Sequence, residues 1–330
     1  MTENDNVRTV AISEDGARLD RALAAALDDL SRSRLKALID GGAIWLDGSP
    51  VREPSRKVRA GQVYEVRVPE ATAAEPAAQA IPLDILYEDD DIIVLDKPAG
   101  LVVHPAPGNP DRTLVNALLA HCGAGFGNDS LTGIGGVLRP GIVHRLDKDT
   151  SGVMIAAKNA AAHASLTAQF SARSIGRAYL ALVHGAPRPA KATIEGNIGR
   201  SPRNRKKMAV VTRGGKPAIT HYATEIRYGP AGEPVASLLR CRLETGRTHQ
   251  IRVHLAHIGH AIVGDPQYGR RVHRKKGSDS EAAALLNAFP RQALHATALA
   301  FDHPRSGSRL EFTTQLPCDY SELIHKLDEL

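Results

Sequence analysis

The stretch GIVHRLDKDTSGVMIAA, residues 141–157, joins two short apolar segments through a polar turn. The segments Ile142–His144 and Val153–Ala157 are apolar and contain β-branched residues, which predicts two strands. Charged and hydrogen-bonding side chains crowd the turn between them: His144, Arg145, Asp147, Lys148, Asp149 and Thr150. Loops at the ends of rigid strands commonly display reactive groups. The stretch therefore predicts two strands joined by a turn that displays reactive groups.

Similar apolar segments recur on both sides of this stretch, often with no helix between them. Adjacent strands without an intervening helix favour antiparallel pairing over a doubly wound parallel sheet. We expect further strands at Ile92–Leu95, Ala178–Val183, Ile219–Ile226, Ala236–Leu243, Ala296–Ala300 and Leu310–Thr313, and helices at Thr113–Leu119, Ala160–Ser171, His249–His257 and Tyr320–Leu327. The sequence thus predicts an α+β fold with a mixed, largely antiparallel sheet.

An Ala-, Pro- and Glu-rich segment at 69–81 has no useful periodicity and is typical of a linker. It predicts a small N-terminal domain at 1–68 and a larger, catalytic-sized domain at 82–330.

The small domain is predicted to form two helices followed by short strands. Apolar residues recur at helical spacing from Leu19, and Ser31 is expected to cap the second helix. That helix carries a basic rim of Arg32, Arg34 and Lys36. The rim fits a small α/β RNA-binding module, and a merely solvated charged face fits these charges equally well.

Composition restricts the class of protein. Among the 330 residues, Lys and Arg exceed Asp and Glu by six, and the pI is about 9.3, which suits a polyanionic partner. The three cysteines are isolated, so neither a disulfide framework nor a structural zinc site is expected. The N-terminus lacks a signal-peptide core, and no apolar run approaches the roughly 18 residues of a membrane helix. We therefore expect a cytoplasmic protein without membrane contact.

Nucleotide-binding and hydrolase signatures are missing from the sequence. Gly133–Gly136 is not a GxGxxG phosphate loop, and no Walker loop or GxSxG motif occurs. The four histidines between 249 and 260 match no zinc spacing, which excludes the common zinc patterns. The expected chemistry therefore uses no metal, nucleotide or other cofactor.

Asp147 is the candidate reactive carboxylate of the turn. Arg145 and Lys148 flank it, and nearby cations favour the charged form of a carboxylate. An ordinary surface turn with local ion pairs would show the same charges. A second dense polar stretch, Leu243–Leu255, contains Arg247 and Arg252, either of which can reach a carboxylate on another strand.

Basic residues gather in two further stretches. The first includes Arg203, Arg205, Lys206 and Lys207, and the second spans Arg270–Lys276. Such loops can neutralise phosphates and give salt-sensitive, weakly sequence-specific affinity for nucleic acid. Solvated loops are the alternative, but two such runs in one chain favour a nucleic-acid partner.

Four stretches of the sequence together resemble the motifs of the large-subunit ribosomal pseudouridine synthases. The stretch HRLDKDTSG at 144–152 is similar to their catalytic motif, and DKPAG at 96–100 to their first motif. RAYLA at 177–181 resembles the tyrosine motif, with Arg177 where the family usually has Lys, and 243–255 resembles the third motif. The N-terminal domain is similar to the S4-like RNA-binding domain of many of these enzymes.

The resemblance implies an isomerase that converts uridines in 23S rRNA, free or in a large-subunit precursor, without a cofactor. Asp147 would be the catalytic carboxylate, acting by covalent attack or by removing a sugar proton. Tyr179 would lie against the uracil, and Arg252 would pair with Asp147, with Arg247 as the second choice. The resemblance or the charge pattern assigns RNA contact to the remaining candidates, which are Arg145, Arg247, Lys97, Arg32, Arg34, Lys36, Arg203, Arg205, Lys206 and Lys207.

Longer stretches, such as 101–119 and 243–269, resemble a branch of the family that acts on the helix 69 hairpin of 23S rRNA. Sister enzymes that modify other 23S uridines share most of these motifs. A non-catalytic, RNA-binding assembly factor and a hydrolase that uses Asp147 with His144 are the rival hypotheses. A monomer is expected.

Overall fold

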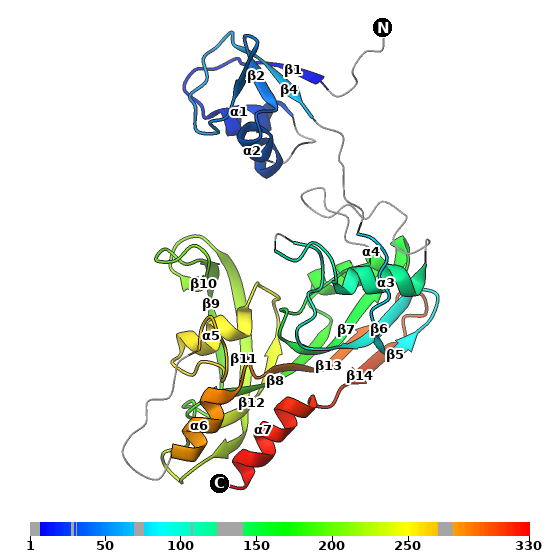
Figure 1. The fold of residues 1–330 in the computed structure, drawn as a ribbon, viewed down its shortest axis with the longest axis vertical. Coiled ribbons are helices and arrows are strands. Elements are labelled where there is room, and N and C mark those ends of the chain that lie inside the picture. The colour runs from blue at the N-terminus through cyan, green and yellow to red at the C-terminus, as the bar shows by residue number, and fades with distance from the viewer. Residues whose placement is uncertain are drawn as a thin grey trace. The chain divides into compact units, whose positions relative to one another are not determined.

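A computed structural model describes residues 7–27, 30, 32–68, 76–106, 108–123, 141–269 and 280–330. These residues form two compact units that divide at Pro76, within the segment expected to be a linker (Figure 1). Each unit has its own hydrophobic core. None of the helices in the described ranges is long and apolar enough to span a membrane.

The N-terminal unit packs two helices against a four-stranded antiparallel sheet in the order β1-β4-β2-β3. Its elements are β1 (Val7–Ala11), α1 (Leu19–Ala26), α2 (Arg32–Asp40), β2 (Ile44–Leu46), β3 (Ser49–Val51) and β4 (Val63–Arg67). Leu19 and Leu23, one helical turn apart, are fully buried, and so are Tyr64 and Val66 on one face of β4. Asp47 and Gly48 both have positive φ and form the two-residue turn of the β2–β3 hairpin. The predicted cap Ser31 lies outside the described residues.

Asp20 fixes the first helix of this unit to the second. Its carboxylate accepts a hydrogen bond from Arg18 Nε at 3.0 Å and from Arg32 Nη2 at 2.8 Å. The Arg18 hydrogen bond is the largest influence on the Asp20 carboxyl, and together with Arg32 it lowers the pKa of Asp20 to about 2. Arg32 thus has a structural partner, although half of its side chain stays exposed.

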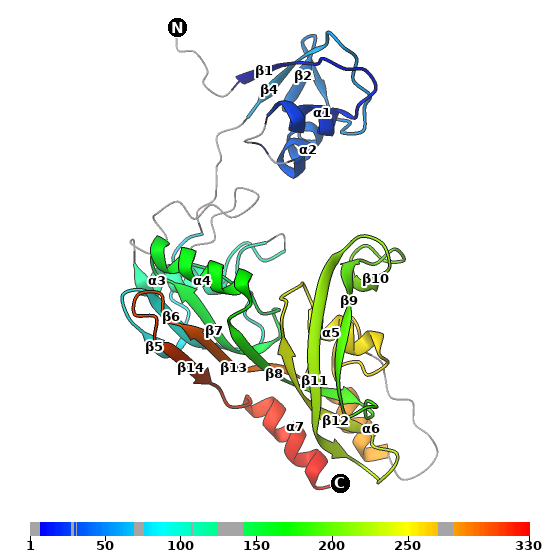
Figure 2. The ribbon, with the colours of Figure 1, turned by 180° about the vertical axis from the view of Figure 1, so that it is seen from behind.

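The larger unit is built on one ten-stranded sheet in the order β10-β9-β11-β12-β8-β13-β7-β6-β5, with β14 added to β13 (Figures 1 and 2). Every pairing is antiparallel except that of β13 with β7, so the predicted mixed, largely antiparallel sheet is confirmed. The strands are β5 (Asp84–Glu88), β6 (Ile92–Lys97), β7 (Ser151–Ala157), β8 (Gly176–His184), β9 (Lys191–Arg200), β10 (Met208–Val211), β11 (Lys216–Tyr228), β12 (Ala236–Leu243), β13 (Leu294–Asp302) and β14 (Arg309–Thr313). The helices are α3 (Leu114–Cys122), α4 (Ala160–Ala172), α5 (Gln250–His257), α6 (Ser280–Ala288) and α7 (Cys318–Asp328).

Strand β7 is the centre of the core, and all seven of its residues are buried. Helix α4 packs against β7, whereas α5 packs against β9, β10 and β11 (Figure 2). The polar turn at 144–150 leads directly into β7, so a fully buried strand positions it.

One predicted strand is wrong. Only Ile142 of the segment Ile142–His144 forms a β-bridge, to Ala156, and the chain then turns away from the sheet. His144 leaves the strand direction because its ring stacks on Phe170 of α4, with ring centroids 4.9 Å apart.

The hairpin β9–β10 was not predicted. Gly196 and Gly199 interrupt the alternation of β9, and glycine weakens a strand pattern. A Cβ on Gly196 would lie 2.8 Å from Val210 Cγ1, so the missing side chain lets β10 pack closely on β9. The first basic run forms the tip of this hairpin.

The end of the expected linker belongs to the larger unit. Gln79 donates its backbone N–H to the Asn116 carbonyl, and Asn116 Nδ2 donates to the Ala77 carbonyl. These bonds attach residues 76–81 to helix α3.

Candidate active site

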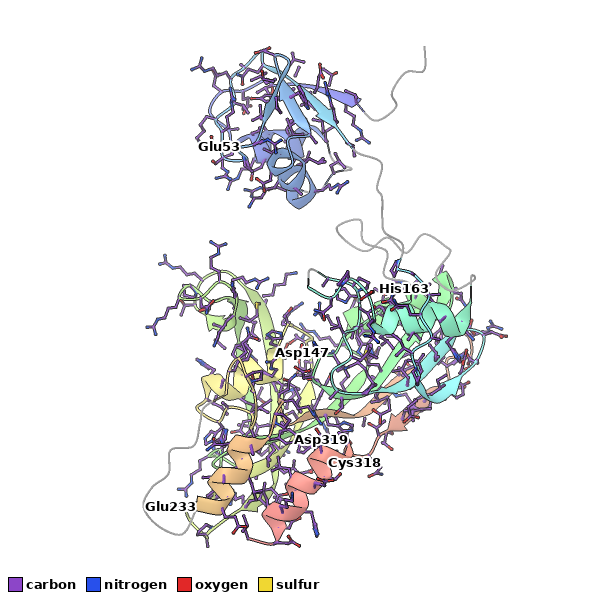
Figure 3. The ribbon with its side chains drawn as sticks, viewed as in Figure 1. Glu53, Asp147, His163, Glu233, Cys318 and Asp319 are labelled. Atoms are coloured by element: carbon purple, nitrogen blue, oxygen red, sulfur yellow. The ribbon has the colours of Figure 1, made fainter. Side chains whose placement is uncertain are left out.

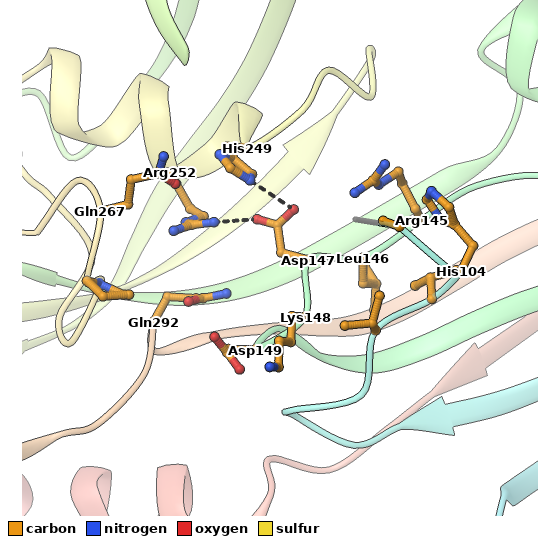
Figure 4. A pocket seen from close by; sticks show the side chains of 14 residues that line it. His104, Arg145, Leu146, Asp147, Lys148, Asp149, His249, Arg252, Gln267 and Gln292 are labelled. Carbon is orange, nitrogen blue, oxygen red and sulfur yellow. Dashed lines mark hydrogen bonds and ion pairs between the residues drawn. The ribbon is translucent and has the colours of Figure 1, made fainter. Parts of the chain in front are cut away.

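A cavity of about 370 Å³ opens beside the polar turn that precedes β7 (Figure 4). It lies between the α5 side and the α3–α4 side of the larger unit, where Figure 3 labels Asp147. Its lining residues are Val102, Val103, His104, Ala106, Arg145, Leu146, Asp147, Lys148, Asp149, His249, Arg252, Pro266, Gln267 and Gln292. The cavity is large enough for one nucleotide.

Close packing and local hydrogen bonds shape the turn. Thr150 donates its backbone N–H to the Asp147 carbonyl at 3.1 Å, and Gly100 donates to the Lys148 carbonyl at 2.9 Å. Gly152 has φ 118°, and a Cβ there would lie 2.2 Å from the Ala296 carbonyl oxygen on β13. Only glycine fits this position, and its close approach to β13 fixes the turn at the end of β7.

Asp147 is held by Arg252, which projects from α5 (Figure 4). Arg252 Nη1 donates to Asp147 Oδ2 at 2.8 Å, while its Nε and Nη2 bind both oxygens of Asp265 at 2.7 and 2.9 Å. The expected partner of Asp147 is therefore in place. Arg247, the second choice, instead donates from Nε to the Pro217 carbonyl.

Charge and burial have opposite effects on the pKa values of Arg252 and Asp265. Burial alone would lower the pKa of Arg252, but its hydrogen bonds to Asp265 and the charge of Asp147 raise it above the usual value. Burial likewise opposes ionisation of Asp265, but the Arg252 guanidinium and two backbone N–H groups lower the pKa of Asp265 below its usual range. Arg252 therefore remains a cation and presents its third donor group to Asp147.

Three residues that were not predicted to lie beside Asp147 complete its surroundings: His249, Asp265 and Tyr268. His249 Nε2 lies 3.8 Å from Asp147 Oδ1, and His249 Nδ1 lies 2.9 Å from the Tyr268 hydroxyl. Burial, with Arg252 and Arg145 nearby, lowers the pKa of His249, against the opposing charges of Asp147 and Asp265. Asp265 and Tyr268 belong to the tight turn after α5, and only the folded chain brings this turn to Arg252.

The prediction that Lys97 contacts RNA is wrong, because its side chain is fully buried. Its ammonium group donates to the carbonyls of Pro98, Leu101 and Lys148 at 2.8, 2.9 and 3.0 Å. Burial lowers the pKa of Lys97 to about 7, with Asp149 and Asp147 opposing that shift. Lys97 therefore links the end of β6 to the polar turn that contains Asp147.

We expect Lys97→Met to destabilise the larger unit by about 2 kcal/mol or more, because it leaves three carbonyls without their donor. The matched control is Lys148→Met, which removes an exposed lysine from the same turn and should change stability by less than about 0.5 kcal/mol. Thermal unfolding measures both variants. Equal melting temperatures would contradict the structural role of Lys97.

The hydrolase hypothesis that used His144 is also wrong. His144 Nε2 accepts the backbone N–H of Ile155 at 3.1 Å, and the residue does not line the cavity. Burial, with Arg177 nearby, lowers the pKa of His144 to about 3. His144 is thus a neutral side chain that packs the turn against the sheet.

Tyr179 lies on β8 with 6% of its surface exposed. It is not among the residues that line the cavity, but it is near enough for Asp147 to affect it. Burial raises the pKa of its phenol, and the negative charge of Asp147 adds to that shift. Contact between Tyr179 and a substrate base therefore remains a proposal.

Several of the cations that were predicted to contact RNA are exposed. Arg145 lines the cavity and is exposed, and so are Arg203, Arg205 and Lys206 at the β9–β10 tip. Lys207 is half-buried, and its ammonium donates to the Gln267 carbonyl while lying 6.0 Å from the centre of the Tyr268 ring. In the N-terminal unit Lys36 is exposed and Arg34 is half-buried. The second basic run, Arg270–Lys276, lies outside the described residues.

One cluster of possible metal ligands occurs in the described ranges, away from the cavity. It consists of Asp89, Asp91 and His303. The Tyr87 hydroxyl donates to Asp89 at 2.8 Å, His303 Nε2 lies 2.8 Å from the same carboxylate oxygen, and Arg305 pairs with Asp91 at 2.7 Å. These partners occupy the carboxylates, so the cluster is a structural network.

Comparison with known proteins agrees with this geometry. A family model described as RNA pseudouridylate synthase matches residues 91–257, and an S4 domain model matches residues 17–63. Ribosomal large subunit pseudouridine synthase D of Zymomonas mobilis is 48% identical over 324 residues, which cover 96% of each chain. The protein of the same name from Xanthomonas campestris is 47% identical over 317 residues, covering 96% of this chain and 91% of that protein.

Among solved structures, Human RNA Pseudouridylate Synthase Domain Containing 1 is 28% identical with a TM-score of 0.53, covering 73% of this chain and 86% of that one. The fold, the S4 domain and the relatives all bear out the expected family. The chain belongs to the RNA pseudouridylate synthase family and is an isomerase of the large-subunit ribosomal type with an N-terminal S4 domain.

Proposed function

We propose that this enzyme isomerises uridines of 23S rRNA in the helix 69 hairpin, with Asp147 as the reacting carboxylate. The observation that supports this mechanism is that the two carboxylate oxygens of Asp147 have different surroundings. Arg252 binds Oδ2, while Oδ1 has no partner closer than His249 Nε2, 3.8 Å away, among the described residues. Oδ1 is therefore the oxygen available to a nucleotide in the cavity.

The carbon–nitrogen bond that breaks and the carbon–carbon bond that forms both belong to the same nucleotide. The C1′–N1 bond breaks, the uracil turns, and a C1′–C5 bond forms. The C5 proton is then lost to solvent, and N1 gains a proton. Asp147 Oδ1 reacts with the sugar, either by attack at C1′ or by removal of a sugar proton, and Arg252 stabilises the carboxylate charge.

The target uridine must leave its stack to reach the cavity. Unstacking costs a few kcal/mol and is easiest in a hairpin loop, which agrees with the proposed target. Arg145 is exposed at the opening and is placed to fill the vacated stack or to grip the backbone. We propose that Tyr179 moves against the uracil and relays the C5 proton to solvent, releasing its own phenolic proton as it accepts the one from C5.

The relatives named ribosomal large subunit pseudouridine synthase D support 23S rRNA, free or in a large-subunit precursor, as the substrate. The N-terminal S4 domain, with Arg32, Arg34 and Lys36, is the proposed second RNA contact. Arg247 is proposed as a phosphate contact beside the site. We propose that the enzyme acts as a cytoplasmic monomer.

Mapping pseudouridines in 23S rRNA from cells that lack this protein tests the target. We expect the helix 69 pseudouridines to disappear while all others remain. Loss at other 23S positions would assign the enzyme to a sister specificity. An unchanged 23S map would contradict the proposed substrate.

The β9–β10 tip should supply affinity and leave the chemical step unchanged. We expect Arg203→Ser, Arg205→Ser and Lys206→Ser together to raise KM for RNA and to reduce the slope of log affinity against log salt by about 3, with kcat unchanged.

The matched control removes three exposed cations at or next to the ends of β9 and β11 that lie away from the tip: Arg188→Ser, Lys191→Ser and Arg227→Ser. Filter binding over a salt series measures the slope for both triple variants. Equal slopes would contradict a phosphate contact at the tip.

A further inference from the structure

The Tyr268 hydroxyl lies between strand β10 and His249, whose ring faces Asp147. Met208 of β10 donates its backbone N–H to the phenol oxygen at 3.0 Å, and His249 Nδ1 lies 2.9 Å from the same oxygen. The Tyr268 ring also lies under the Arg252 guanidinium, 5.1 Å from its centre to the guanidinium carbon. One phenol thus contacts the hairpin, His249 and Arg252.

Proton counting determines which tautomer of His249 these contacts favour. The phenol oxygen accepts the Met208 N–H, and its single proton is then available to His249 Nδ1. A histidine whose Nδ1 accepts a hydrogen bond carries its proton on Nε2.

The other side of the ring favours the same tautomer. Nε2 faces Asp147 Oδ1 at 3.8 Å, and a carboxylate attracts an N–H group and repels a nitrogen lone pair. Both neighbours of His249 therefore favour the tautomer with the proton on Nε2.

This tautomer affects Oδ1 of Asp147, the oxygen that Arg252 does not bind. Arg252 holds Oδ2, so the orientation of Oδ1 depends on what lies on its own side of the carboxylate. An Nε2–H directed at Oδ1 adds attraction there, whereas the other tautomer would present a lone pair. The Met208 donor comes from the strand that follows the basic tip, so the hairpin also holds the phenol in place.

We propose that Tyr268 is a positioning residue for the isomerisation, which acts by keeping His249 Nε2–H directed at Oδ1 of Asp147. This inference rests on the proposed function of Asp147 as the reacting carboxylate. Tyr268 touches no substrate in this account and acts through His249.

The first test removes only the hydroxyl. Tyr268→Phe should lower kcat by about 10-fold or more with KM for RNA nearly unchanged, in the range typical of residues that orient a functional group. The control is Tyr222→Phe on β11, which removes a hydroxyl that donates to the Pro189 carbonyl outside the cavity, and it should leave kcat unchanged. An unchanged kcat in Tyr268→Phe would overturn the proposal.

The second test reads the tautomer directly. Two-dimensional NMR of the ¹⁵N-labelled full chain distinguishes protonated from unprotonated ring nitrogens, and the signals missing from His249→Gln identify His249. We expect Nε2–H in the wild type and a mixture of tautomers in Tyr268→Phe. The proposal would be overturned if His249 carries its proton on Nδ1 in the wild type. It would also be overturned if the tautomer of His249 is the same in Tyr268→Phe as in the wild type.

The third test replaces the ring with amides. The amide nitrogen of Gln can occupy the place of Nε2, whereas that of Asn can occupy the place of Nδ1. We expect His249→Gln to keep at least 10-fold more kcat than His249→Asn, although Asn better tolerates the left-handed backbone of this residue, whose φ is 57°.

Equal or reversed values would overturn the proposal. Asp147→Asn, run alongside, separates the two claims: if it is inactive while Tyr268→Phe is fully active, only the positioning role fails. If Asp147→Asn is active, the proposed function fails.

Discussion

Asp147→Asn should abolish pseudouridine formation, with the rate reduced on the order of 10⁴-fold or more. Asn has the shape of Asp but no negative charge, so it can neither attack the sugar nor accept its proton. Arg252 keeps both hydrogen bonds to Asp265, so no buried charge is left unpaired by the change. The fold and RNA affinity should therefore be preserved.

Release of tritium from RNA that carries [5-³H]uridine measures this reaction, because C5 loses its hydrogen when it bonds to C1′. Asp149→Asn is the matched control, since Asp149 lines the same cavity two residues away. It should keep activity within about 10-fold of the wild type. An Asp147→Asn protein with comparable activity would remove the carboxylate from the mechanism.

Arg252→Met should damage both stability and catalysis. The Asp265 side chain has no exposed surface, and removal of its cation leaves a buried, unpaired charge. Loss of one partner of a buried ion pair costs about 3–5 kcal/mol. Asp147 also loses its only hydrogen-bond donor among the described side chains, so the rate should fall by about 10²–10³-fold.

A second substitution separates these two effects. Asp265→Asn in the Arg252→Met background removes the buried charge and should recover part of the lost melting temperature. It should recover no activity, because Asp147 still lacks its cation. If thermal unfolding and tritium release recover together, Arg252 acts on the rate only through the stability of the fold.

The residues of the candidate site could be predicted from the sequence where they lie within one motif. Asp147 and its flanking cations occupy one turn, and Arg252 lies on α5, within the stretch that resembles the third motif. His249, Asp265 and Tyr268 were missed as functional residues because their roles depend on distances between α5, the turn after it and β10. No periodicity in the sequence encodes those distances.

Burial explains the remaining errors. Lys97 lies in the stretch that resembles the first motif and was expected to contact RNA, but three carbonyls satisfy its ammonium group inside the fold. The strand expected at Ile142–His144 was lost because the His144 ring packs inward on Phe170. In both places tertiary contacts outweigh the local preference of the residue type.

The most direct test of the account is to restore the gene in cells that lack this protein and to map 23S rRNA pseudouridines. Wild-type protein should restore the helix 69 pseudouridines. Asp147→Asn, expressed at the same level and bound to RNA with the same affinity, should restore none. Restoration of those pseudouridines by Asp147→Asn would contradict the central claim that this carboxylate performs the isomerisation.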